Sequence, residues 1–139
     1  MKVIALDLSS RTGFAYGGMD TYTPRHGVWR LPSIAEAESQ GRAFSALRRH
    51  LSDLHAVEKF DVLIYEAALD TYRHTAGNTR KSADLARGLI GLTCIAEEWG
   101  ETHKLDVLDC NVQTVRTFFV GDPRPRDPKA VVKTRCRQL

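Results

Sequence analysis

The sequence predicts an α/β fold in which a five-stranded mixed sheet is flanked by helices. Short apolar segments separated by turns open the chain, and two long segments with helical spacing follow, each leading to a further strand. Two of the apolar segments end in an acid, Asp7 and Glu66. A carboxylate inside an apolar strand is costly to bury, so this placement favours a ligand-binding role.

The first 30 residues predict a three-stranded antiparallel meander. Residues 2–8 read as a buried strand, residues 13–17 follow after a turn, and residues 26–30 form the third strand. Connections this short join antiparallel neighbours, whereas parallel strands need a longer crossover.

A first long helix is predicted after the meander. Pro32 precedes it, and Ser33 with Glu36 has the spacing of a capping box. Four apolar residues then recur at helical spacing and predict one buried face: Phe44, Leu47, Leu51 and Leu54.

The strand 61–66 comes next, and after a polar loop a second helix is predicted over residues 80–99, ending at Gly100. Gly88 and Gly91 would let this helix approach the sheet closely. Its apolar stripe comprises Leu85, Leu89, Leu92, Ala96 and Trp99.

The remaining chain predicts a fifth strand and two shorter helices. The strand covers residues 105–108, and it makes two parallel strands beside the meander together with 61–66. Asn111 and Asp127 are the expected N-caps of the helices. The last helix carries apolar residues up to Leu139 with no C-cap, so we expect it to be incomplete.

Length and composition predict one domain over residues 1–139. The hydrophobic share of 42% and the charged share of 27% are those of an ordinary globular protein. No apolar run reaches the roughly 20 residues of a membrane helix, and no signal peptide is recognised, so a cytoplasmic location is expected. The three cysteines, Cys94, Cys110 and Cys136, are expected to be reduced and mostly buried.

Basic residues gather at the end of the chain. From Asn111 onward, seven basic residues stand against two acidic ones, although the whole chain has a net charge of only +3. Such a segment on a protein with an acidic cluster favours a polyanionic partner. A solvated helix face explains the same charges equally well.

The order of elements, and several motifs, resemble RuvC-type Holliday-junction resolvases of the ribonuclease-H-like superfamily, particularly divergent phage and prophage relatives. The match is carried by Ile4-Ala5-Leu6-Asp7-Leu8-Ser9-Ser10 with Thr12-Gly13-Phe14-Ala15, by Val62-Leu63-Ile64-Tyr65-Glu66, by Leu85-Ala86-Arg87-Gly88, and by Val115-Arg116 with Val120-Gly121, Lys129 and Val132. It extends over almost the whole chain.

This resemblance implies a metal-dependent, structure-selective DNA endonuclease. Asp7 and Glu66 match the first two acidic ligands, and Mg²⁺ or Mn²⁺ prefers such carboxylate oxygens. Two ions about 4 Å apart would generate hydroxide and stabilise the leaving oxygen. No small-molecule cofactor is implied.

The chain departs from the family pattern at its end. The family carries two further acids on a final helix, but nothing after Asp127 is acidic here, so the chain looks truncated. We therefore expect weak metal binding and poor cleavage. Asp109 could substitute as a ligand, although a polar strand end explains it more simply. Asp70 and Asp84 are weaker candidates, and His74 has no partner histidine at a useful spacing.

Several residues are predicted to contact branched DNA. Arg116, Lys129 and Lys133 would bind phosphates, and Lys129 could act with the N-terminal amides of its helix. The loop after Glu66 would lie near the cut, where Tyr72 or Leu69 could wedge against an unstacked base at the crossover. Packing of either side chain in the core is the alternative. Its basic residues are Arg73, Arg80 and Lys81. For each basic residue, a solvated surface charge is about as good an explanation.

The family works as homodimers on the two-fold symmetric junction, and the helix 80–99 is the expected dimer element by resemblance. Packing on the sheet explains the apolar stripe of this helix equally well. Two other functions compete with nuclease activity. One is a nuclease-dead module that binds branched DNA with the same fold. The other is an actin-like nucleotide-handling protein, but such chains need a second domain and a glycine-rich phosphate loop.

Overall fold

The computed structural model describes residues 1–20, 23–66 and 80–111, followed by 113–114, 121, 126–127, 129–131 and 133–134. The chain divides into two compact units, Met1–Asp109 and Cys110–Leu139. The first unit contains the sheet, two long helices and the candidate site. The second unit contributes short helical pieces, which are described by themselves below.

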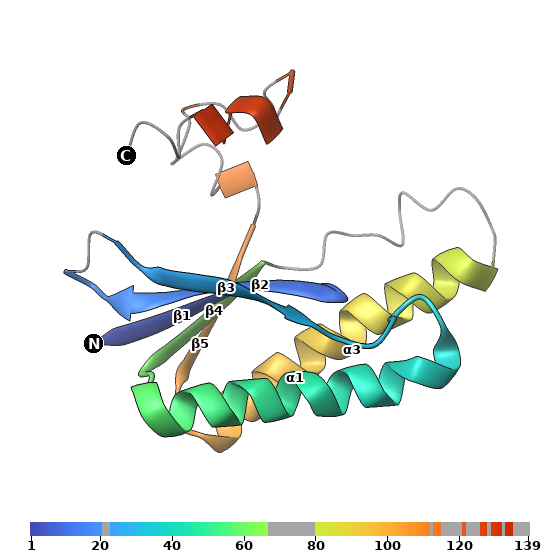
Figure 1. Ribbon diagram of the computed structural model, residues 1–139, viewed down its shortest axis with the longest axis horizontal. Helices are drawn as coiled ribbons and strands as arrows, with labels where there is room; N and C mark the ends of the chain where they lie inside the picture. Colours follow the sequence, from blue (N-terminus) through green and yellow to red (C-terminus); the bar gives the residue numbers. More distant parts are fainter. Residues whose placement is uncertain are drawn as a thin grey trace. The chain divides into compact units, whose positions relative to one another are not determined.

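A five-stranded mixed sheet forms the centre of the first unit, with the strand order β3-β2-β1-β4-β5 (Figure 1). β1 pairs antiparallel with β2, β2 pairs antiparallel with β3, and β1 pairs parallel with β4. This arrangement confirms the predicted sheet. The strands are β1 Lys2–Asp7, β2 Arg11–Gly18, β3 Arg25–Arg30, β4 Val62–Glu66 and β5 Asp106–Cys110.

Alternating side chains give the two faces of the sheet different environments. Ile4 and Leu6 on β1, and Leu63 and Tyr65 on β4, are at most 5% exposed. The residues between them belong to the opposite face, because successive side chains of a strand point to opposite sides. Ile64 on that face is only half-buried. One face of the sheet therefore forms the core, and the other is more open.

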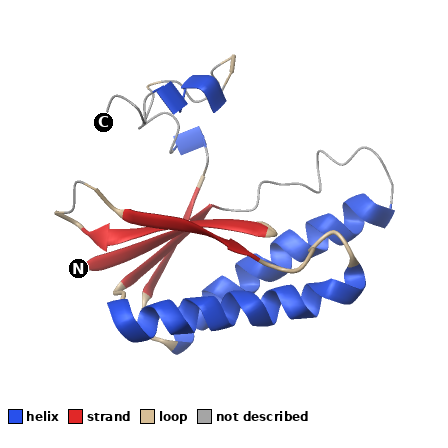
Figure 2. Ribbon diagram, in the orientation of Figure 1, coloured by secondary structure: helices blue, strands red, loops and turns tan. Residues whose placement is uncertain are grey.

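Helices α1 (Ala37–Glu58) and α3 (Arg80–Thr102) both lie on the core face of the sheet (Figure 2). The predicted apolar stripes pack there, with the exception of Leu85, which is 41% exposed. The fully buried apolar positions described on the two helices are Ala43, Leu47, Leu51, Leu92 and Ala96, with Trp99 1% exposed.

The predicted capping box at the start of α1 is wrong. The helix begins at Ala37, and its N-cap residue Glu36 makes no side-chain cap hydrogen bond. Instead, the Ser33 hydroxyl accepts a hydrogen bond from the Ala35 amide at 3.3 Å, and the Ser33 carbonyl accepts one from the Ser39 hydroxyl. These bonds hold Ser33 in a turn before the helix.

The glycines of α3 serve close packing, but not where the sequence predicted it. A Cβ on Gly88 would stand 2.5 Å from the Ile34 carbonyl oxygen, and one on Gly91 would stand 2.2 Å from Phe44. Both neighbours belong to α1 or to the segment before it, so the predicted approach to the sheet is wrong for these two. Gly100 does face the sheet, because a Cβ there would stand 2.5 Å from the Val107 side chain. The predicted helix end at Gly100 is wrong, since α3 continues to Thr102.

The second unit confirms the two predicted caps. The Asn111 side chain accepts a hydrogen bond from the Gln113 amide at 2.8 Å, and the Asp127 side chain accepts one from the Ala130 amide at 3.0 Å.

Cys94 is exposed and Cys110 half-buried, so the prediction of mostly buried thiols is wrong for the two described cysteines. In the part of the chain that the structure describes, no helix is long and apolar enough to cross a membrane.

We predict that Gly88→Ala destabilises the protein by about 1–3 kcal/mol, because the new methyl group would press on the backbone of Ile34. Gly41→Ala is the matched control. It also lies inside a helix, but an added Cβ there meets nothing within 4 Å. It should stabilise the protein by about 0.5–1 kcal/mol through the loss of glycine's backbone entropy. Urea denaturation measures both; equal effects of the two substitutions would contradict the packing argument.

We also predict a loss of stability on mild acidification. The pKa of His55 is lowered by burial and then by the charges of His103 and Lys59. Its Nδ1 accepts the Phe60 amide hydrogen bond at 3.1 Å, which a protonated ring cannot do. The unfolded chain thus binds a proton more readily than the folded one, and stability falls as pH drops through about 6.5.

Urea midpoints between pH 7.5 and 5 measure this effect. The pKa of His50 is lowered too, mainly by burial, and adds to the same decline. His55→Asn should reduce the decline, whereas replacement of the exposed His26 should leave it unchanged. A wild-type midpoint that does not fall over this range would contradict the prediction.

Candidate functional site

Asp7 and Glu66 occupy neighbouring positions at the carboxyl ends of two parallel strands. Leu6 of β1 pairs with Tyr65 of β4, and the next residue of each strand is an acid. Adjacent strands lie about 5 Å apart, so the two acids are next to each other. Both alternate with buried residues of the core face and therefore share the opposite, more open face. The parallel pairing brings together two acids separated by 58 positions of sequence.

The two carboxylates are accessible to a ligand. Asp7 is exposed and Glu66 is half-buried, so the expectation that Asp7 is buried inside its strand is wrong. Asp7 is the last residue of β1, at the carboxyl end of the strand and on the face opposite the core. Gly13 lies opposite Asp7 on β2, and even an added Cβ there would stand 3.6 Å from the Asp7 Cβ. The side of Asp7 that faces β2 thus carries no side chain.

The turn after Asp7 is held by a network of hydroxyl groups. Thr12 is fully buried, and its hydroxyl donates a hydrogen bond to the Ser9 carbonyl at 2.7 Å. The Ser9 hydroxyl accepts one from the Arg11 amide at 3.1 Å. Ser10 fixes the turn to the segment after β3, because its carbonyl accepts from the Leu31 amide at 2.8 Å and its hydroxyl accepts from the Ile34 amide at 3.1 Å.

This network is a part of the site that sequence reasoning missed. The sequence indicates the serines and the threonine only as a turn and as part of the family motif. The signal was available in principle, because Ser and Thr in a tight turn commonly bond to nearby backbone groups. Burial of Thr12, however, depends on the packing of distant segments. The turn fixes the position of Asp7 at the end of β1 and of Arg11 at the start of β2.

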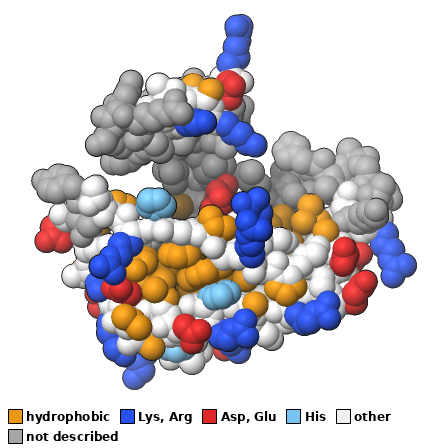
Figure 3. Space-filling view, viewed as in Figure 1, with side chains coloured by type: hydrophobic (Ala, Val, Ile, Leu, Met, Phe, Trp, Pro, Cys, Tyr) orange, Lys and Arg blue, Asp and Glu red, His pale blue; other side chains and the backbone are white. Residues whose placement is uncertain are grey.

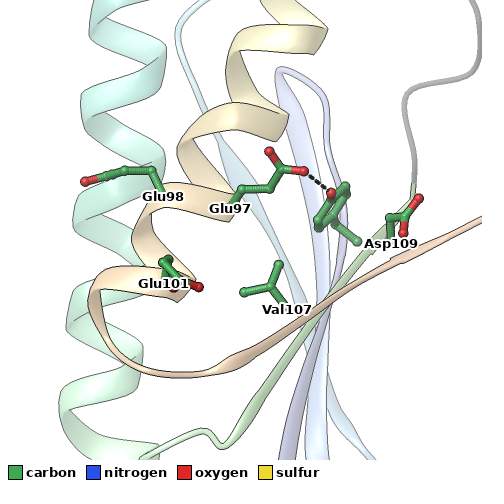
Figure 4. Close-up of a pocket in the computed structure, with 6 residues that line it drawn as sticks. Glu97, Glu98, Glu101, Val107 and Asp109 are labelled. Atoms are coloured by element: carbon green, nitrogen blue, oxygen red, sulfur yellow. Dashed lines mark hydrogen bonds between the residues drawn. The ribbon is translucent and has the colours of Figure 1, made fainter.

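Asp109 lies on a different side of the sheet from Asp7 and Glu66. It falls inside β5, beyond the predicted end of that strand at residue 108. Val107, two positions earlier, packs against Gly100 of α3, so Asp109 shares the helix-covered side. Figure 4 shows Asp109 at the rim of a hollow of about 490 Å³. The hollow is lined by Tyr65, Glu97, Glu98, Glu101, Val107 and Asp109.

Tyr65 connects this hollow to the core. Its hydroxyl donates a hydrogen bond to the Glu97 carboxylate, drawn as the dashed line in Figure 4. Burial is the main cause of its raised pKa, followed by the hydrogen bond to Glu97 and the negative charges of Glu97 and Asp109. Tyr65 therefore stays protonated over the physiological range and acts as a donor. The hollow is an acidic surface beside a neutral phenol.

The described acids fit a single Mg²⁺ ion better than an all-protein metal cage. Among the residues that the structure describes, no three His, Cys, Asp or Glu side chains form a group that could hold a metal. Magnesium commonly keeps several waters and is held by one or two carboxylates together with substrate phosphates. Asp7 and Glu66 provide that kind of donor set.

The predicted DNA-contacting residues are only partly described. Arg80 is exposed at the first position of α3, and Lys129 and Lys133 are exposed in the second unit. Asp84 is half-buried on α3, where its carbonyl accepts a hydrogen bond from Gln40 at 2.6 Å. The other candidates lie outside the described residues: Leu69, Asp70, Tyr72, Arg73, His74, Arg116 and the side chain of Lys81.

Solved structures similar to this one identify the fold. The structure of RuvC from Thermus thermophilus matches all of this chain and 80% of its own, with a TM-score of 0.67 and 10% identity. The T. thermophilus RuvC complex with a Holliday junction substrate matches with a TM-score of 0.69 and 10% identity, over all of this chain and 78% of its own.

The chain has the RuvC fold. The likeness concerns the fold alone, because only one residue in ten is identical. Ribonuclease H1 from Halobacterium salinarum is 14% identical over 80% of this chain and 84% of its own, but a TM-score of 0.35 supports no conclusion. No protein-family model and no curated protein matches the sequence.

We predict that Thr12→Val destabilises the protein by about 1–3 kcal/mol, because it leaves the Ser9 carbonyl without its hydroxyl donor. Thr23→Val is the control, since Thr23 is exposed and should change stability by less than about 0.5 kcal/mol. Urea denaturation measures both. A Thr12→Val protein as stable as wild type would contradict a structural role for this turn.

Proposed function

We propose that this chain is a metal-dependent, structure-selective endonuclease that acts on Holliday junctions or other branched DNA. The observation that carries the proposal is the parallel pairing of β1 and β4, which sets Asp7 beside Glu66 on one open face. The fold supports it, because one of the similar structures is a RuvC bound to a Holliday junction substrate.

In this function Asp7 and Glu66 would hold Mg²⁺ or Mn²⁺ and, through it, orient a backbone phosphate of the DNA. The bound ion would neutralise charge on the phosphate and lower the pKa of an attacking water. Asp7, which is exposed, would face the ion and the substrate. Glu66, which is half-buried, would fix the ion against the sheet. The turn held by Thr12 keeps Asp7 at the end of its strand.

The exposed basic residues fit a DNA partner. Arg80 stands at the start of α3, and Lys129 and Lys133 are exposed in the second unit. We assign to them, and to Tyr72, Arg73, Lys81 and Arg116, contacts with phosphates or bases along the junction arms. These contacts would be salt-sensitive and largely independent of sequence.

We also propose that the protein acts as a cytoplasmic homodimer of the phage or prophage type. A four-way junction is two-fold symmetric and needs two matched cuts. Leu85 and Ile90 of α3 are 41% and 42% exposed, which supports α3 as the dimer element. A gel-filtration mass measured with and without junction DNA tests this assembly.

A nuclease-dead module that binds branched DNA is the second candidate. It is favoured by the absence, among the described residues, of any third acid grouped with Asp7 and Glu66. Metal sites of nucleases that use two ions usually have more ligands. Both candidates predict junction binding in EDTA, and only cleavage separates them.

We predict slow, Mg²⁺-dependent cleavage of a labelled four-way junction, which Asp7→Asn reduces to background because the amide is a poor ligand for Mg²⁺. Asp20→Asn is the control, since Asp20 is exposed in the turn after β2 and should keep the wild-type rate. Gel analysis of cut products measures the rates.

The other outcomes separate the two candidates. Junction binding with no cleavage in Mg²⁺ or Mn²⁺ would establish the nuclease-dead module. Cleavage that survives Asp7→Asn would remove Asp7 from the site. Cleavage as fast as that of fully active resolvases would contradict the expected weak metal binding.

A further inference from the structure

A hollow with a basic lining lies between the end of β3 and α1, away from the carboxylates. Its volume is about 480 Å³. It is lined by Arg30, Pro32, Gly41, Arg42, Ser45, Ala46, Arg49 and His50, with no acidic residue among them. Arg30, Arg42 and Arg49 are all exposed. The function proposed above makes no use of these three arginines.

The hollow is kept open by its own residues. Gly41 has nothing within 4 Å of the position where a Cβ would stand, so no side chain fills that side. The His50 ring stacks on Trp29 of β3, with centroids 5.2 Å apart and planes 7° from parallel. Burial, and then the charge of Arg49, lower the pKa of His50. At neutral pH this ring therefore forms a wall, and the arginines supply the charge.

The ion pairs of the described residues leave these arginines aside. Glu58 pairs with Lys2 and with Arg25, and Glu98 pairs with Arg48. In the described part of the chain, no carboxylate lies within ion-pairing distance of Arg30, Arg42 or Arg49. In the view of Figure 3, the lower part of the molecule, formed by α1, carries several Lys and Arg side chains beside a hydrophobic area.

Strand pairing adds a fourth positive charge. Arg30 stands directly opposite Arg11 on β2. The Leu31–Ser10 backbone hydrogen bond at 2.8 Å follows immediately and holds the two strand ends together. Like charges directly opposite across antiparallel strands are unfavourable unless a counter-charge is present. This like-charge pair is a second observation, independent of the hollow, that points to an anion.

The position of these charges relates them to the candidate site. Arg11 begins β2, one turn after Asp7, at the same edge of the sheet. Arg30 ends β3, two strands or about 10 Å from β1. Arg42 and Arg49 lie two helical turns apart on α1, which is again about 10 Å. We name Arg11, Arg30, Arg42 and Arg49 the arginine track; it begins beside Asp7 and leads across the sheet edge to α1.

We propose that the arginine track binds successive backbone phosphates of one DNA arm that leads away from the phosphate held at Asp7. Charges spread over this length suit a polyanion better than a single small anion, since phosphates recur about every 3.4 Å along one strand of a duplex. Guanidinium groups bind phosphate oxygens in a bidentate manner. This inference rests on the proposed DNA-binding function and adds a surface that neither the sequence nor the resemblance indicated.

The test is the salt dependence of binding to a labelled four-way junction and to a labelled unbranched duplex, by fluorescence anisotropy in EDTA. Affinity falls as salt rises, so the slope of log affinity against log salt is negative. Each lost phosphate contact reduces the magnitude of this slope by about 0.9, and the changes in slope given below refer to its magnitude. We expect Arg42→Gln with Arg49→Gln to lower it by about two and to weaken binding about tenfold or more near 0.1 M salt, on both DNAs. Arg42→Lys with Arg49→Lys should restore most of the slope, because charge is kept.

Arg48→Gln is the matched control. It removes the same kind of side chain from the same helix, but Arg48 pairs with Glu98 at 2.9 Å and does not line the hollow. Its slope should change by less than about 0.5. Circular dichroism melting of every variant shows whether the fold is kept. Arg30→Gln, which alters a strand end and no helix, should lower the slope by about one and provides a second variant.

Two results would overturn the arginine track. One is an unchanged slope on both DNAs in the folded double glutamine variant. The other is polyglutamate binding that this variant loses while its DNA binding is intact, which would assign the track to an acidic polypeptide. If the wild-type protein binds junction and duplex equally and cuts neither, the proposed function fails. In that case a shallower salt slope for the double glutamine variant than for wild type still supports the arginine track. If wild type binds no DNA, both proposals fail.

Discussion

The parallel pairing of β1 with β4 is the constraint on which the rest of the structure depends. β1 is the central strand, with β2 and β3 on one side and β4 and β5 on the other. A parallel neighbour requires a crossover, and α1 supplies it on the core face of the sheet. The same pairing places Asp7 and Glu66 at one edge. The core and the candidate site are thus two consequences of one strand register.

The two faces of the sheet carry different kinds of side chain, because successive residues of a strand point to opposite faces. The core face carries the large apolar residues and both long helices, and close contacts at Gly88 and Gly91 bring these helices together. The opposite face carries the two carboxylates. A polar site can therefore stand one residue beyond Leu6, which is 5% exposed, without burying charge in the core. Asp109 belongs to the helix-covered side, where it contributes to the acidic hollow beside Tyr65.

Charges are also separated in space. Carboxylates gather beside Tyr65 and at the ends of β1 and β4, whereas the arginine track runs from the ends of β2 and β3 to α1. Glu58 pairs with Lys2, and Glu98 pairs with Arg48, so neither carboxylate neutralises these arginines. In the proposed function, a DNA strand running over this part of the sheet would meet the carboxylates of Asp7 and Glu66 first and the guanidinium groups next. That order suits an enzyme that must hold both the reacting phosphate and the arm that carries it.

The sequence by itself determined the order of elements, the apolar faces of both helices and the two acids, because periodicity and strand ends are local properties. Tertiary structure alone decided the start of α1, the continuation of α3 through Gly100, the exposure of Asp7 and the side on which Asp109 lies. Each depends on contacts between distant segments, such as Ile34 with Gly88 or Val107 with Gly100. The arginine track belongs to this second group, since its members come from three elements and share no spacing. Sequence periodicity describes one element at a time, whereas a site is made where several elements meet.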